Sequence, residues 1–88
     1  MRMVSKKITV LNESGFHIRP ASEVAKAAEA CSSKVEIIYK HNIINAKSLL
    51  NILSVSIKKG AEIELCCSGP EEKEDLEALT DLILHLEK

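Results

Sequence analysis

Apolar and polar residues alternate along four short segments of the chain, and this alternation predicts four β-strands, each with one buried face. The four segments are Lys6–Leu11, Lys34–Lys40, Ile43–Ala46 and Ala61–Cys67. In the last segment Cys66 falls on the polar face and Cys67 on the apolar face. Between the second and third segments, His41-Asn42 predicts a two-residue hairpin turn, because asparagine tolerates a positive φ.

Three further segments have apolar residues at three- and four-residue spacing, which is typical of helices with one buried face. They are Ile18–Cys31, Ser48–Leu53 and a last helix that starts after Gly69-Pro70. Acidic residues at the start of the last helix favour the positive end of its dipole: Glu71, Glu72, Glu74 and Asp75. The element order is therefore βαββαβα. It predicts an α+β fold, an open-faced β-sandwich in which a four-stranded antiparallel sheet has three helices on one face.

The length and charge of the chain narrow the classes of function. Its 88 residues suit a single domain, residues 1–88, and a formal net charge of -1 provides no basic face for nucleic acid. Phe16 and Tyr39 are the only aromatic residues, so the chain has no platform for base stacking. The apolar runs are too short to span a membrane, and Met1–Val4 leads into a strand rather than a signal peptide. We therefore expect a cytoplasmic protein that binds no nucleic acid and does not insert into membranes.

The three cysteines, Cys31, Cys66 and Cys67, form a poor disulfide framework, because their number is odd and two are adjacent. A metal-binding module of similar α/β sandwich shape is an alternative interpretation of the chain, but it would need a Cys-x-x-Cys loop. Cys66-Cys67 lies inside a predicted strand instead. We therefore expect no metal site, and small, soft thiol side chains in a reducing compartment.

The segment Gly15–Ser22 places a histidine where a loop becomes a helix. Pro20 suits the first turn of that helix, because the N–H that proline lacks has no partner there in any case. Unbonded backbone N–H groups and the positive end of the helix dipole then lie near His17. They favour an uncharged ring nitrogen as a nucleophile and, with the cation of Arg19, a phosphoryl group attached to it. Taken alone, the short motif also fits a histidine that caps the helix beside a solvated arginine.

A second candidate lies at Asn45–Leu50, where Ser48 suits the N-cap of the short helix. A helix N-terminus also tolerates a phosphate, so Ser48 could be modified without refolding. The apolar residues of this helix cover too wide an arc for one sheet to bury, so at least Leu50 is expected to be exposed. These residues are Leu49, Leu50, Ile52 and Leu53. Alone, they indicate either a docking patch or plasticity of the core.

Together, the two segments resemble the histidine phosphocarrier family (HPr) of the phosphoenolpyruvate-dependent sugar phosphotransferase system. The first family signature is close to Gly-Leu-His-Ala-Arg-Pro-Ala, and it is matched in register by Gly15, His17, Arg19, Pro20 and Ala21. The second signature, Ala-Lys-Ser followed by two apolar residues, is matched by Ala46, Lys47, Ser48, Leu49 and Leu50. Their separation and the element order are also those of the family, and the resemblance runs over nearly the whole chain.

The resemblance implies a monomeric phosphotransfer intermediate that needs no cofactor, rather than a free-standing catalyst. His17 would accept a phosphoryl group on its δ1 nitrogen (a pros-phosphohistidine) from enzyme I and pass it to sugar-specific IIA domains. Arg19 would stabilise the group. Ser48 would be modified by an ATP-dependent kinase that damps this relay, and a transcriptional regulator is a further implied partner. The shared docking surface would include Leu49, Leu50 and Leu53.

The chain departs from the family pattern at three places. Ile18 replaces the usual small residue between histidine and arginine, and Asn51 and the pair Val55-Ser56 stand where the family commonly has glycine. The phosphate-carrying residues are intact. The departures leave open an alternative, a specialised relative that acts mainly as a regulatory protein through Ser48.

Overall fold

The computed structural model describes residues 3–13 and 15–86, and its elements follow the predicted order. The strands are β1 (Val4–Thr9), β2 (Lys34–Tyr39), β3 (Asn42–Asn45) and β4 (Glu62–Ser68). The helices are α1 (Ile18–Ala30), α2 (Leu49–Leu53) and α3 (Glu72–Leu84). Met1 and Arg2, which begin the segment expected to lead into the first strand, lie outside the described residues.

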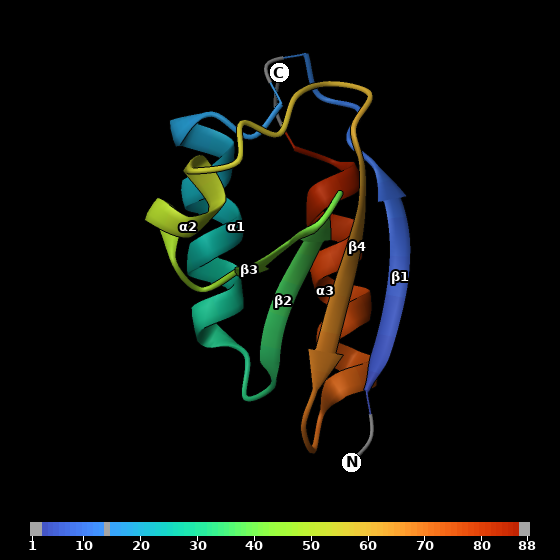
Figure 1. The fold of residues 1–88 in the computed structure, drawn as a ribbon. Helices are drawn as coiled ribbons and strands as arrows, with labels where there is room; N and C mark the ends of the chain where they lie inside the picture. Colours follow the sequence, from blue (N-terminus) through green and yellow to red (C-terminus); the bar gives the residue numbers. More distant parts are fainter. Residues whose placement is uncertain (1–2, 14, 87–88) are drawn as a thin grey trace.

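The four strands form one antiparallel sheet in the order β1-β4-β2-β3. Figure 1 shows α1 and α3 packed on one face of this sheet. The short helix α2 packs against α1 and β3, on the side of the molecule that carries the β3 edge of the sheet. Among the described residues, the other face of the sheet carries no helix. The predicted open-faced β-sandwich is confirmed.

The core lies between the sheet and the two long helices. The strands contribute alternate apolar residues, all buried: Ile8, Val35, Ile37, Ile44, Ile63, Leu65 and Cys67. Small buried residues on α1, such as Ala21, Ala25 and Ala28, let that helix approach the sheet closely, while α3 contributes Leu79 and Ile83. Each fully buried large apolar side chain stabilises the fold by about 1.5–3 kcal/mol. No helix in the part of the chain that the structure describes is long and apolar enough to cross a membrane.

The hairpin turn lies one residue earlier than predicted. Tyr39 pairs with Asn42, so the turn residues are Lys40 and His41, and Lys40 has the positive φ, at 57°. The reason is the strand register, which places Ile37 opposite Ile44 and buries both. Burial of this pair outweighs the preference of asparagine for the turn.

Two further details differ from the sequence predictions. Strand and helix bounds shift by one or two residues, and Cys31 is the C-cap of α1 rather than its last residue. Cys66 is buried, with 3% of its surface exposed, although it lies on the face of β4 opposite to Leu65 and Cys67. The cause is that β4 is a central strand, so Ser5 and Glu36 flank Cys66 on both sides.

Candidate functional site

His17 occupies the N-cap of α1, in extended conformation (φ -81°, ψ -170°). Its carbonyl oxygen accepts the first hydrogen bond of the helix, from the Ala21 N–H at 2.9 Å. The first N–H groups of a helix have no acceptor inside it, and because Pro20 has no N–H, the free donors of this first turn are those of Ile18 and Arg19. The His17 side chain is exposed and makes no capping hydrogen bond. The imidazole therefore stands free beside two N–H donors at the positive end of a 13-residue helix.

The loop before His17 is held by backbone contacts with the segment that follows α2. The Phe16 N–H donates to the Ile57 carbonyl oxygen at 2.9 Å, and the side-chain amide of Asn12 donates to the Gly15 carbonyl oxygen. Gly15 has a φ of +62°, and a Cβ there would lie 2.5 Å from the same Ile57 oxygen. Glycine is therefore the one residue that fits this close approach, and the approach sets the position of His17.

An ion pair links the same two loops at the surface. The Lys59 ammonium lies 2.7 Å from a carboxylate oxygen of Glu13, and both side chains are exposed. The hydrogen bond and the positive charge of Lys59 hold the pKa of Glu13 below its ordinary value. Such exposed pairs contribute little to stability, so the backbone contacts carry most of the connection between the loops.

Arg19 and Ile18 lie in the first turn of α1, and both are exposed. Within residues 3–13 and 15–86, the Arg19 guanidinium takes part in no ion pair. It is therefore available to an anion near His17. The Ile18 side chain is 63% exposed, so the added bulk at this position lies at the surface and not in the core.

Ser48 is the N-cap of α2, as predicted, and is half-buried. Its hydroxyl oxygen accepts the Asn51 N–H at 3.2 Å. The side-chain oxygen of Asn51 accepts the Asn45 N–H at 3.4 Å, and the Lys47 ammonium donates to the Cys31 carbonyl oxygen at 3.3 Å, at the end of α1. The start of α2 is therefore attached to both β3 and α1.

Leu50 on α2 is exposed, as the sequence predicted. Leu50 is 79% exposed, whereas Leu49 and Leu53 are half-buried against the core and Ile52 is fully buried. Since α1 packs against α2, exposed Leu50 and exposed Ile18 lie on neighbouring helices.

The sequence interpretation missed the role of the loop after α2. Ile57 and Asn12 support the His17 loop, and neither was singled out. The available signal was at Ser56, which stands near a position where glycine is common in the family. Its φ of 50° lies in the left-handed region that glycine enters most easily.

The cysteines are free thiols in this fold. Burial raises the pKa of Cys67 to about 11 and also raises the pKa of Cys66, so both remain protonated near neutral pH. Among the described residues, no three His, Cys, Asp or Glu side chains gather where they could hold a metal ion.

Comparison with known proteins agrees with the fold and with the family that the sequence resembles. Residues 4–84 match the family described as "PTS HPr component phosphorylation site". The phosphocarrier protein HPr of Treponema pallidum (strain Nichols) is 36% identical over 80 residues, which make up 91% of each chain. The crystal structure of the phosphocarrier protein HPr from Bacillus anthracis str. Ames has a TM-score of 0.88 at 31% identity, covering 92% of this chain and 96% of that one.

A more distant similarity is to Crh, the catabolite repression protein of Bacillus subtilis, whose crystal structure is a domain-swapped dimer. That structure has a TM-score of 0.75 at 28% identity, covering 97% of this chain and 98% of that one. The expectation of a monomer for this chain therefore stays a prediction.

The open-faced β-sandwich and the resemblance over residues 4–84 place the chain in the class of small phosphocarrier domains. With the match over residues 4–84 and relatives above 30% identity, the chain belongs to the HPr family, the phosphocarrier component of the phosphotransferase system.

Proposed function

We propose that this protein carries a phosphoryl group on the δ1 nitrogen of His17, which it accepts from enzyme I and passes to sugar-specific IIA domains in cytoplasmic sugar uptake. The observation that carries the proposal is the exposed imidazole at the start of α1, free of any capping bond. In the transfer, the unprotonated nitrogen attacks phosphorus, a P–N bond forms, and the bond between phosphorus and its previous carrier breaks.

The surroundings of His17 favour the product of this step. The attached group brings a charge of about -2 at neutral pH. The N–H groups of Ile18 and Arg19, the helix dipole and the Arg19 guanidinium all stabilise negative charge at this place. Each of these groups is already part of the helix start that carries His17.

Incubation with phosphoenolpyruvate and enzyme I tests the proposal. We expect one acid-labile phosphate per chain, lost completely in His17→Ala with an unchanged thermal midpoint, because an exposed ring contributes little packing. His41→Ala is the matched control, since His41 is also exposed but lies in the β2–β3 turn. Undiminished labelling of His17→Ala would contradict the proposal.

We further assign partner docking to Leu49, Leu50 and Leu53, which the 79% exposure of Leu50 supports. Leu50→Ser should slow transfer from enzyme I without lowering the free energy of unfolding, because an exposed leucine loses no core contact. Ile43→Ser is the control, since Ile43 is 67% exposed but lies on β3. Equal slowing by both variants would point to a general effect of surface polarity instead.

A second candidate function is regulation through Ser48 by an ATP-dependent kinase, with a transcriptional regulator as the reader of the modified protein. The observation that favours it is the position of Ser48, at the start of α2 and immediately before the leucines. Similarity to a catabolite repression protein also supports it. Assaying each phosphorylation separately, with enzyme I and then with a serine kinase and ATP, discriminates a sugar-transport carrier from a mainly regulatory protein.

A further inference from the structure

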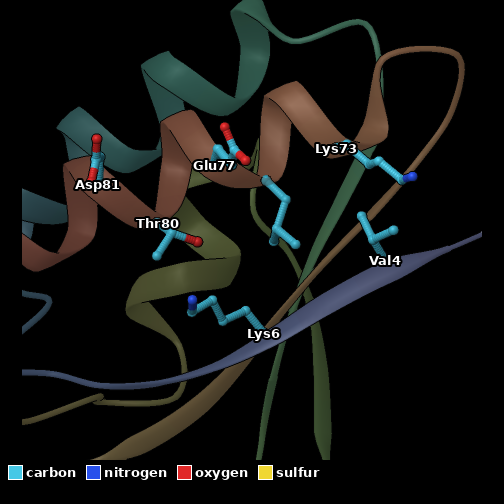
Figure 2. Close-up of a pocket in the computed structure, with 7 residues that line it drawn as sticks. Val4, Lys6, Lys73, Glu77, Thr80 and Asp81 are labelled. Carbon is cyan, nitrogen blue, oxygen red and sulfur yellow. The ribbon is translucent and has the colours of Figure 1, made fainter.

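A cleft of about 510 Å³ lies between β1 and α3, and Figure 2 shows the residues that line it. One wall is the first half of β1, through Val4 and Lys6. The other is a single stripe of α3, residues 73, 76, 77, 80 and 81, which recur at the spacing of one helix face. Because β1 is the outermost strand and pairs only with β4 among the described residues, the cleft runs beside a free sheet edge.

The groups that face this cleft lack partners. Thr80 is only 7% exposed, and its hydroxyl oxygen has no hydrogen-bond partner in the part of the chain described. Figure 2 shows the Lys6 ammonium and the Thr80 side chain in the space between strand and helix. Glu77 and Asp81 also line the cleft, and their carboxylates point away from β1 in this view. None of these charged side chains is in an ion pair within the described residues. A buried hydroxyl without a partner is unfavourable, so a ligand that supplies one gains affinity.

The free edge of β1 could pair with a second copy of this chain or with a segment of another protein, and the charges on β1 favour the second. In an antiparallel pair of two β1 strands from two copies of this chain, Lys6 and Lys7 of one copy would face lysines of the other. Like charges directly opposite each other destabilise a sheet, and lysine is a residue that keeps sheet edges from pairing with themselves. An extended segment with acidic residues opposite Lys6 and Lys7 would instead gain attraction at both places.

We propose that the free edge of β1 and the cleft beside it bind an extended acidic segment of a partner protein, which adds a fifth strand to the sheet. Alternate side chains of the added strand enter the cleft against Leu76 and Thr80, while its backbone groups bond to β1. An edge strand beside a helix is the geometry that this form of recognition uses.

This surface is separate from the proposed relay surface. The sheet order places β1 and β3 at opposite edges, and α2 packs against β3, so Leu50 lies across the molecule from the cleft (Figure 1). A segment on β1 and a partner on α1 and α2 can therefore be bound together.

The probe is a seven-residue valine peptide with two adjacent glutamates at its centre, which can face Lys6 and Lys7 on the two faces of the strand; it is added to the full chain and followed by amide NMR shifts. We expect shifts in residues 4–9 and 73–81, and none with a control peptide in which lysine replaces glutamate. Lys6→Glu should weaken binding about three- to tenfold, since it turns an attraction into a repulsion. Lys26→Glu, at an exposed position of α1, is the matched control and should bind normally.

Three outcomes overturn the proposal: no shifts in β1 at millimolar peptide, shifts confined to α1 and α2, or equal binding of the basic peptide. If Lys6→Glu does not fold, Lys7→Glu tests the second expected contact, because Lys7 is exposed on the other face of the strand and would face the neighbouring glutamate of the peptide. Labelling of His17 is expected to be unchanged in every variant, so failure of this proposal leaves the proposed carrier function intact.

Discussion

The starts of α1 and α2 can be compared directly, because each has at its N-cap a residue proposed to carry a phosphate. His17 makes no capping bond and is exposed, whereas the Ser48 hydroxyl caps its helix through the Asn51 N–H and is half-buried. The position of His17 comes from the backbone behind it, through Gly15 and Ile57. Because the backbone holds the loop, the His17 side chain is free to react. The Ser48 side chain caps its helix, so a change to it is expected to alter the stability of the fold.

The largest expected effect is at Gly15. Gly15→Ala should lower the free energy of unfolding by about 2–4 kcal/mol, because the Cβ adds strain at positive φ and meets the Ile57 oxygen. Urea unfolding measures the change. Gly60→Ala is the control, with φ at +89° but no atom within 4 Å of the added Cβ, so it should cost about 1 kcal/mol. Equal losses would show that the contact with Ile57 does not hold the His17 loop.

The second effect separates the two caps. Ser48→Ala should lower the free energy of unfolding by about 1 kcal/mol, since it removes the bond to the Asn51 N–H. His17→Ala should change it by less than about 0.5 kcal/mol, because the exposed ring makes no capping bond. Parallel thermal and urea unfolding of both variants gives the comparison. If His17→Ala proves the more destabilising, the distinction between the two helix starts is wrong.

A third effect concerns rate rather than stability. Ser48→Asp places negative charge beside Leu49 and Leu50 and should slow phosphoryl transfer to His17 about threefold at low salt, by repelling a partner that presents acidic groups to Arg19. Ser48→Ala should transfer normally, and the backbone structure of both should be unchanged. Single-turnover transfer from phosphorylated enzyme I measures the rates. Transfer to the aspartate variant at the unmodified rate would leave Ser48 as a helix cap alone.

The smallest effect is expected at Ser56, in the loop between α2 and the contacts that hold the His17 loop. Ser56→Gly should relieve the left-handed backbone strain (φ 50°) but add freedom to the unfolded chain. The net stabilisation should be at most about 1 kcal/mol, and labelling of His17 should not change. A loss of stability in urea unfolding would mean that the serine side chain, and not its backbone, matters there.

The order of the elements and the buried faces follow from the sequence alone. Alternation in β4 and three- and four-residue spacing in α1 are local patterns, and each element must bury its apolar face against another. The helix starts at His17 and Ser48 were predicted for the same reason, because Pro20 and a capping hydroxyl act within one turn of helix. The exposure of Leu50 also followed, since α2 has more apolar positions than one sheet can cover.

Contacts between distant segments were decided only by the tertiary structure. The hairpin register depends on burying Ile37 with Ile44, which overrides the local preference of Asn42 for a turn. The close approach of Gly15 to Ile57 and the cleft between β1 and α3 each join segments that lie more than forty residues apart. No local pattern encodes such contacts, because they depend on how the packed helices and the sheet place the chain in space.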